Sequence, residues 1–229
     1  MNDDNADLRP VRVWDLPTRL FHWTLALCII GSLTTAKIGG NAMEWHFKFG
    51  YVVLALLAFR LLWGVVGGRW SRFTSFIYSP LTLLRYLRGR ARADEHLDVG
   101  HSPTGALSVF ALLAILAIQV GTGLVADDEI ANTGPLIKFV SGATSSLATS
   151  WHKTYGQWLI IGLVVLHILA IVFYLVKKRQ NLIGPMLSGD KPLPGGVPAS
   201  TDSALSRGLA VALIAACAAG VLWLIGLGA

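Results

Sequence analysis

The chain has 229 residues, of which 54% are hydrophobic and 14% are charged, and its net charge is +6. Soluble domains carry about 25% charged residues, so this composition excludes an ordinary soluble protein, and the apolar excess excludes a disordered one. Two cysteines exclude a disulfide-rich scaffold. The positive charge does not indicate a nucleic-acid-binding protein, because the charged side chains lie outside long apolar stretches.

Five stretches of the chain contain almost no charged side chain. In chain order they are residues 20–36, 49–68 (interrupted by Arg60), 100–126, 154–176 and 208–229. A helix needs about 20 apolar residues to cross the hydrocarbon core of a membrane, and none of these stretches shows the period of two that is typical of a strand. The sequence therefore predicts an all-α integral membrane protein with five transmembrane helices.

The Lys and Arg residues are divided unequally between the two sides. Most lie before residue 20 or in the segments 69–99 and 177–207, whereas the other side holds Lys37, Lys48, Lys138 and Lys153. Cytoplasmic loops are enriched in Lys and Arg, so we expect a multi-pass protein of the bacterial inner membrane with a cytoplasmic N-terminus and a periplasmic C-terminus. The acidic bias before the first stretch favours a retained helix there over a cleaved signal peptide.

This pattern divides the chain into four parts. They are a cytoplasmic N-terminal segment (1–18), a four-helix bundle (19–180), a cytoplasmic linker (181–205) and a fifth helix (206–229). Gly and Pro are frequent in residues 190–204, which predicts a loose connector. Residues 208–229 contain no charged side chain and no histidine, which favours a helix that is appended to a four-helix unit.

Four of the six histidines lie inside or at the ends of the apolar stretches, where an ionisable side chain is costly and indicates a function. They are His22, His46, His152 and His167. The last two are 15 residues apart on one predicted helix, which gives about 22 Å of rise and about 60° of rotation. The alternating direction of successive helices then places His46 at the depth of His152, and His22 at the depth of His167.

Two opposed imidazoles from helices that face a bundle core can close a six-coordinate iron site. Such a site has no open position for oxygen or substrate, and it suits electron transfer because both oxidation states keep the same ligands. A single histidine on an apolar face is more often structural, but four at two matched depths favour ligation. The pattern predicts two bis-histidine haems, His22 with His167 and His46 with His152, and the Cys-x-x-Cys-His motif of c-type haem is absent.

The depths of the inner pair do not match on ideal helices. His167 lies ten residues before Lys177, whereas His22 lies three residues after Arg19, a difference in depth of about 10 Å. Either the fourth helix extends past the membrane or the first helix begins before Arg19, and the sequence does not distinguish the two.

Three further residues are candidates for cofactor binding. Arg60 lies 14 residues after His46, about 21 Å deeper on a similar face, and thus at the level of the inner pair. A haem propionate would neutralise a buried arginine there; the alternative is an arginine that reaches the cytoplasmic surface. Arg19, at the cytoplasmic end of the first stretch, is the second candidate. His101, just before the third helix, could donate to a quinone or cap that helix.

The segments around these residues resemble the bacterial cytochrome b561 family, which includes the b-type cytochrome subunit of nickel-iron hydrogenases. The matching segments are 13–23 (VWDLPTRLFHW), 59–64 (FRLLWG), 86–90 (YLRGR), 100–107 (GHSPTGAL), the WH of 151–152 through the LH of 166–167, and 181–191 (NLIGPMLSGDK). Together they span about residues 11–191. Their combination is specific, although a WH or GH pair alone would carry no weight.

The resemblance implies a four-helix transmembrane bundle that binds two b haems, with His22, His46, His152 and His167 at the ligand positions. The fifth C-terminal transmembrane helix departs from the family's minimal pattern. The hydrogenase and formate-dehydrogenase relatives react with quinone near the haem on the cytoplasmic side. This makes His22, His101 and His167 the expected surroundings of a quinone site.

We therefore expect a di-haem b-type cytochrome that transfers electrons between the quinone pool and a periplasmic redox partner, such as a c-type cytochrome or a hydrogenase-like subunit. No residue is assigned as catalytic, and lipid, but not nucleic acid, is a further expected partner. Two other classes of function stay open: a proton relay or transporter built on the histidines and Arg60, and a structural membrane anchor for an enzyme. Transporters show Gly or Pro interruptions at the midplane of matching halves, which these stretches lack.

Overall fold

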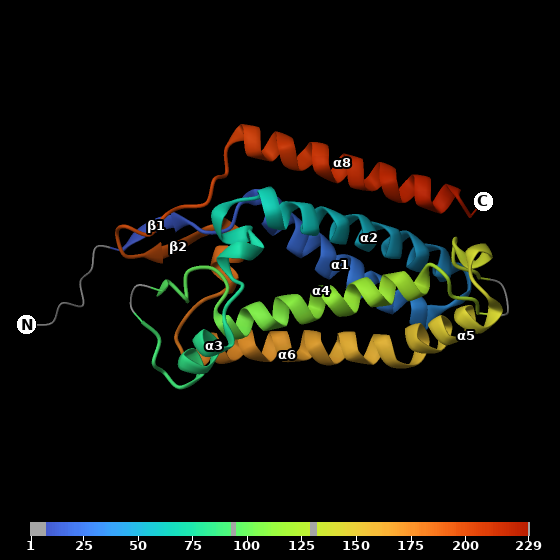
Figure 1. Cartoon of the computed structure of the whole chain (residues 1–229), viewed down its shortest axis with the longest axis horizontal. Helices are drawn as coiled ribbons and strands as arrows, with labels where there is room; N and C mark the ends of the chain where they lie inside the picture. The colour runs from blue at the N-terminus through green and yellow to red at the C-terminus, as the bar shows by residue number, and fades with distance from the viewer. Residues whose placement is uncertain (1–7, 93–94, 129–131, 229) are drawn as a thin grey trace, which may run out of the picture. The chain divides into compact units, whose positions relative to one another are not determined.

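The computed structural model of the chain describes residues 8–92, 95–128 and 132–228. Within these residues, five helical segments are long and apolar enough to cross a membrane (Figure 1). They are Leu16–Ile38 (α1), Gly40–Val66 (which contains α2, Met43–Val66), Pro103–Gly123 (α4), Gly142–Val176, and Ala204–Gly226 (α8). The prediction of a helical membrane protein with five spans is confirmed in this form. Its division into a four-helix bundle and an added helix stays a prediction.

The fourth span begins well before its predicted start at residue 154. It consists of α5 (Gly142–Ser150), a π-helical turn, η6 (Trp151–Gly156), and α6 (Gln157–Val176). The side chain of Ser141 accepts a hydrogen bond from the backbone N–H of Thr144 and caps the start of α5. Counting from charge to charge placed the boundary at Lys153, but the helix continues through this residue.

The first helix begins at Leu16, before Arg19, because Asp15 caps it. The Asp15 side chain accepts a hydrogen bond from the backbone N–H of Thr18 at 2.8 Å. This carboxylate is fully buried and joins the start of α1 to the end of α2. Its other donors are Trp63 Nε1, the Gly68 backbone N–H and Ser71 Oγ, at 2.9 to 3.3 Å.

Contacts divide the chain into two compact units that cut across the long helices. Unit 1 comprises Met1–Leu20, Leu61–Phe110 and His167–Ala210, and unit 2 comprises Phe21–Arg60, Ala111–Leu166 and Val211–Ala229. The short helices are η1 (Gly40–Ala42), η2 (Arg69–Ser71), η3 (Phe73–Ser75), α3 (Pro80–Leu87), η5 (Ile137–Phe139) and α7 (Ile183–Ser188). The boundaries predicted along the chain, after residues 18, 180 and 205, stay predictions.

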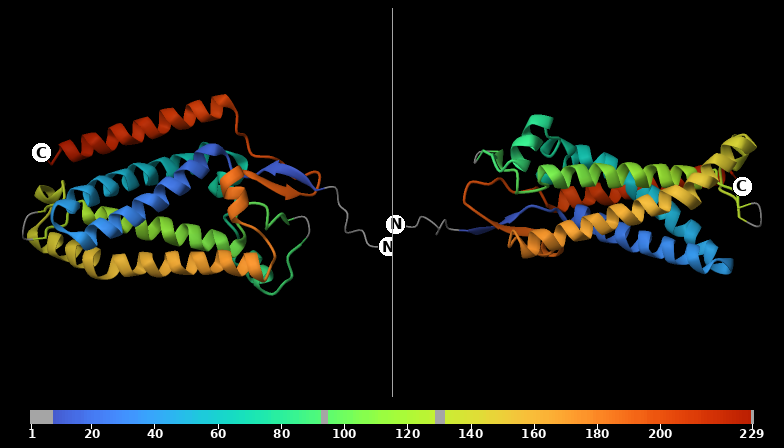
Figure 2. Two further views of the ribbon diagram at one scale, coloured as in Figure 1. Left: turned by 180° about the vertical axis from the view of Figure 1, so that it is seen from behind. Right: turned by 90° about the horizontal axis from the view of Figure 1, so that it is seen from below.

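Unit 1 contains a small antiparallel sheet of β1 (Arg9–Arg12) and β2 (Asp190–Leu193), which lie side by side in both views of Figure 2. Pro10 is opposite Pro192, a position that tolerates two residues without N–H groups because alternate pairs in such a ladder exchange no hydrogen bonds. The prediction of a loose connector over residues 190–204 is therefore wrong for residues 190–193, which form this strand. The Gly and Pro content of the segment gave no sign of its pairing with residues 9–12.

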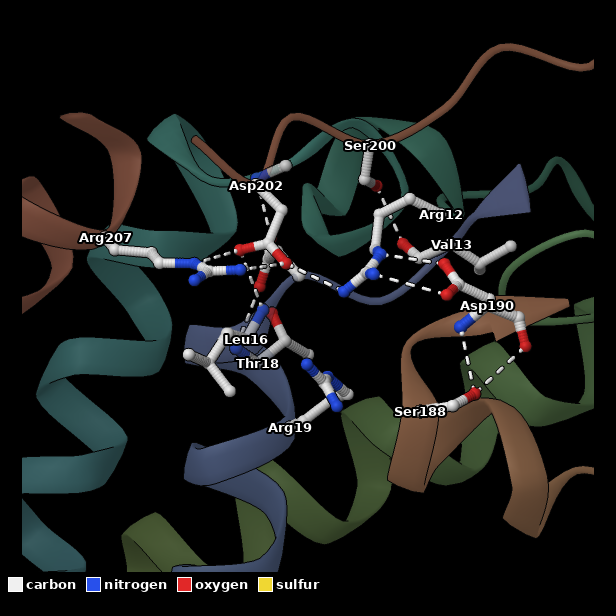
Figure 3. A network of polar contacts seen from close by, with 12 residues as sticks. Arg12, Val13, Leu16, Thr18, Arg19, Ser188, Asp190, Ser200, Asp202 and Arg207 are labelled. Atoms are coloured by element: carbon white, nitrogen blue, oxygen red, sulfur yellow. Dashed lines mark hydrogen bonds and ion pairs between the residues drawn. The ribbon is translucent and has the colours of Figure 1, made fainter. Parts of the chain in front are cut away.

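An ion-pair network fixes the same connector to the start of α8 (Figure 3). The Asp202 carboxylate pairs with Arg12 Nη1 and with Arg207 Nε, both at 2.9 Å, and accepts a hydrogen bond from the backbone N–H of Leu16. Arg12 Nε also pairs with Asp190 at 2.8 Å. Burial alone would raise the pKa of Asp202, but the hydrogen bonds and charges of these donors hold that pKa below its usual value.

Unit 2 has an apolar core that four helices supply. Its buried members are Cys28, Val53, Leu57, Ile115, Leu116 and Ile160. Small residues let helices approach closely in membrane proteins, and Gly31 illustrates this, since a Cβ there would lie 2.7 Å from the ring of Phe49. Cys28 packs in this core as a small apolar residue, and its thiol is free.

Candidate functional site

Two of the four histidines from the sequence analysis meet in unit 2. His46 lies in the first turn of α2, and His152 lies in the π turn of the fourth span. Their ring centroids are 5.9 Å apart, and their ring planes are 87° apart. The structure thus brings together the two residues that were expected to share the outer depth.

The same nitrogen of both rings bonds to a backbone carbonyl. His46 Nδ1 lies 3.0 Å from the carbonyl oxygen of Ser32, and His152 Nδ1 lies 2.8 Å from that of Gln119. A carbonyl only accepts hydrogen bonds, so each Nδ1 carries the proton and each Nε2 keeps a lone pair. This is the tautomer that binds a metal through Nε2, with a second hydrogen bond that orients the ring.

His152 is also positioned by α4. Gln119 Nε2 donates a hydrogen bond to the His152 carbonyl oxygen at 3.0 Å. A Cβ on Gly123 would lie 2.8 Å from His152 Cε1, so this glycine makes room for the ring. Gly123 is one of several glycines that could admit a porphyrin edge, whereas Gln119 was not identified from the sequence. Gln119 offered a signal, because it is a long polar side chain within the apolar residues 100–126.

The π turn changes the geometry that a regular helix predicts. A π turn holds one more residue than an α-helical turn, which rotates the following helix back by up to about 100°. The offset between His152 and His167 then moves from about +60° toward −40°, so the two residues stay on similar faces.

The outer pair fits the haem that the sequence predicts. The ring separation of 5.9 Å would let His46 Nε2 and His152 Nε2 both bind one iron at about 2 Å each. When bound, b-type haem would need only these two ligands from the chain. Over the described ranges, no group of three or more His, Cys, Asp or Glu residues could hold a metal ion.

The inner histidines belong to different units, and each is placed by its own helix. His22 lies on α1 in unit 2, half-buried and edge-on to Trp23. His167 lies on α6 in unit 1. Since α1 begins at Leu16 and α6 ends at Val176, the two lie about 9 Å and about 14 Å from their helix ends. Of the two explanations for the unequal depths of His22 and His167, the first helix beginning before Arg19 is the one observed, and it reduces the difference. The pairing of the two residues stays a prediction.

Arg60 is buried, with 3% of its surface exposed. It lies 14 residues after His46 on one uninterrupted helix, so the predicted offset of about 21 Å applies. The burial argues against an arginine that reaches the cytoplasmic surface. Arg19 donates a hydrogen bond to the carbonyl oxygen of Leu187 in α7, and a cofactor contact of either arginine stays a prediction.

His101 does not cap the third helix. Ser102 takes this role, because its Oγ accepts a hydrogen bond from the backbone N–H of Gly105 at 3.3 Å. The His101 ring packs against Trp14 and Phe76, with ring centroids 4.7 and 4.4 Å away. Tyr78 donates a hydrogen bond to the His101 carbonyl oxygen, and burial with the nearby charge of Asp98 raises the pKa of Tyr78 to about 12.

Comparison with curated proteins finds relatives over most of the chain. The chain is 26% identical over 214 residues to the "Probable Ni/Fe-hydrogenase B-type cytochrome subunit" of Bradyrhizobium diazoefficiens, covering 79% of this chain and 85% of that protein. It is 24% identical to the "Probable Ni/Fe-hydrogenase 1 B-type cytochrome subunit" of Escherichia coli K12, covering 77% and 88%. A Rhodobacter capsulatus relative is 25% identical, covering 79% and 81%. No solved structure matches the chain.

The sequence model of one family matches the greater part of the chain. This family is described as prokaryotic cytochrome b561, and the match covers residues 13–189. The matched range includes all four candidate ligands and the three candidates for cofactor binding, Arg19, Arg60 and His101. The chain therefore belongs to the prokaryotic cytochrome b561 family and is a membrane cytochrome that binds b-type haem and transfers electrons.

Proposed function

We propose that the protein carries electrons between the quinone pool and a redox partner on the periplasmic face of the bacterial inner membrane. Two b haems would serve this transfer, one held by His46 and His152 and the other by His22 and His167. Each haem, when bound, supplies an iron that changes oxidation state while its ligands stay the same. The observation that carries the proposal is the outer pair, whose rings lie 5.9 Å apart with both Nδ1 protons on backbone carbonyls.

The chain's own residues would hold the two cofactors and set their spacing. His152 and His167 lie on one helical span, about 22 Å apart by helix rise. Haems held at both sites would be separated edge to edge by less than this distance, so stepwise electron transfer between the two sites is feasible. The buried guanidinium of Arg60 would neutralise a propionate at the inner level.

The proposed redox partner is a hydrogenase-like subunit. The names of the relatives, which describe B-type cytochrome subunits of Ni/Fe hydrogenases, support this choice. The excess of Lys and Arg on the side of the N-terminus supports its cytoplasmic location and hence a periplasmic C-terminus. A phosphatase reporter fused to the C-terminus should then be active in intact cells.

A haem assay on purified protein tests the proposal. A reduced-minus-oxidised visible spectrum with pyridine haemochrome quantitation should give two low-spin b haems per chain, and a quinol should reduce them. A protein without haem, or with haem that no quinol reduces, would overturn the proposal. One haem per chain would overturn the inner pair alone.

A further inference from the structure

A chain of hydroxyl groups in unit 1 ends at an exposed carboxylate. It runs from Ser102, at the start of α4, through Tyr174 of α6 and Tyr86 of α3 to Asp98. The oxygen–oxygen distances are 3.2 Å from Ser102 to Tyr174, 2.8 Å from Tyr174 to Tyr86 and 2.9 Å from Tyr86 to Asp98. Four residues from three helices and one loop thus form a continuous hydrogen-bonded path.

The carboxylate sets the direction of every hydrogen bond in this path. Ionised Asp98 only accepts, so Tyr86 donates its hydroxyl proton to Asp98. The oxygen of Tyr86 must then accept from Tyr174, and the oxygen of Tyr174 must accept from Ser102. All three O–H groups therefore point from Ser102 toward Asp98, and one concerted shift moves one proton equivalent along the whole path.

The path leads from water into the partly buried part of unit 1. Asp98 is exposed, whereas Tyr86, Tyr174 and Ser102 are half-buried. Tyr174 lies seven residues after His167 on α6, two helical turns or about 10 Å away on nearly the same face. Ser102, the inner end of the path, is therefore the neighbour of His101 in the chain, and the next member, Tyr174, lies two helical turns from a proposed inner haem ligand.

We propose that Ser102, Tyr174, Tyr86 and Asp98 conduct the protons of a quinone–quinol couple that binds beside His101. This inference rests on the proposed function, in which quinol gives its electrons to the ferric haem iron. For each electron, one quinol O–H bond breaks and its proton passes to Ser102. The protons of Ser102, Tyr174 and Tyr86 each shift by one position, and a new O–H bond forms on Asp98, which then releases its proton to cytoplasmic water. Quinone reduction reverses each step.

Other charged groups surround the path without interrupting it. Lys191 of β2 donates a hydrogen bond to the backbone carbonyl of Asp98, and burial lowers the pKa of this lysine. Arg85, next to Tyr86 on α3, is paired with Glu95. Burial and the neighbouring Tyr174 and Asp98 raise the pKa of Tyr86, so this residue passes protons as a neutral phenol.

The test compares haem reduction by quinols with haem reduction by dithionite in purified protein. Reduction by dithionite does not need the proposed proton path. Stopped-flow absorbance follows haem reduction by decylubiquinol, by a short-chain menaquinol and by dithionite. Tyr86→Phe, Tyr174→Phe and Asp98→Asn should each slow reduction by the quinols about tenfold or more, and leave the haem spectrum and dithionite reduction unchanged. Asp98→Glu should restore most of the rate. Tyr51→Phe, which removes a hydroxyl from α2 in unit 2, is the matched control and should react as the wild type does.

Two measurements separate a proton path from a structural role. The solvent isotope effect of quinol-driven reduction should differ between wild type and the two phenylalanine variants. An infrared difference spectrum on quinol addition should contain a carboxylic-acid band that Asp98→Asn removes. Wild-type rates in both phenylalanine variants would overturn the path while leaving the proposed function intact. A wild-type haem that neither quinol reduces would overturn the proposed function, and the path with it.

Discussion

Unit 2 and unit 1 use polar groups in different ways. In unit 2 the helices pack through an apolar core, and the polar contacts of His46 and His152 include one backbone carbonyl for each ring. In unit 1 the carboxylates of Asp15 and Asp202 each gather several donors and join segments that are far apart in sequence. The difference indicates that unit 2 positions the two proposed haem ligands with little charge, whereas unit 1 holds helix ends together and contains the proposed path for protons.

The largest expected effect comes from a proposed haem ligand in unit 2. His152→Ala should lower the haem content from the proposed two to one per chain, because the proposed outer site would keep only His46 of its two imidazoles. Pyridine haemochrome quantitation measures this loss. His96→Ala changes an exposed loop histidine and should keep both haems. If the folded His152→Ala protein lost both haems or kept both, the pairing with His46 would be wrong.

The second effect belongs to unit 1 and should appear in stability. Asp15→Ala should lower the free energy of unfolding by about 3 kcal/mol or more, because it leaves several buried donors, such as Trp63 Nε1 and Ser71 Oγ, without their acceptor. Thermal unfolding in detergent measures the change, and the outer haem should stay bound. Asp190→Ala removes a partly exposed ion pair and should cost about 1 kcal/mol or less. Equal losses in the two variants would contradict the role of Asp15.

A smaller effect is expected at Gly123, where α4 lies close to the proposed ligand His152. Gly123→Ala places a Cβ 2.8 Å from His152 Cε1, so the ring must shift and outer haem affinity should fall by about 10- to 100-fold. Gly121→Ala is a matched control on the same helix, because a Cβ there meets nothing within 4 Å. Haem titration of the two variants gives the comparison. A similar affinity in both would show that the close approach of Gly123 does not position His152.

The smallest effect is a dependence on pH at the start of α8. The pKa of Asp202 is lowered on folding, so its stabilising effect is complete above its usual value of 3.8 and is lost as the pH falls through the lowered pKa. Asp202→Asn should therefore lower the unfolding temperature by a few degrees at neutral pH. The difference in unfolding temperature between Asp202→Asn and the wild type should disappear below about pH 4. A gap that does not change with pH would exclude the ion pairs with Arg12 and Arg207 as its cause.

Hydrophobicity alone predicted the spans, because a membrane helix is set by composition over about 20 residues. The meeting of His46 and His152 also followed from sequence, since alternating helix directions place both residues at one depth. The pairing of residues 9–12 with 190–193 did not follow, because it is a contact between distant segments without a local pattern. The hydrogen bonds of the two rings to the carbonyls of Ser32 and Gln119 could not be predicted from the sequence either, because every residue carries the same backbone oxygen.

The π turn at Trp151–Gly156 lets the fourth span hold one extra residue without changing the directions in which its two halves face. This turn holds one residue more than an α-helical turn, so deleting one residue between His152 and Gly156 would convert the turn to a regular one. His152 and His167 would then be about 14 residues apart on a regular helix, which gives the same offset of about −40°. Within this family, an insertion or deletion of one residue at this turn would therefore keep both proposed haem ligands on similar faces, and sequence comparisons should allow a gap between the two histidines.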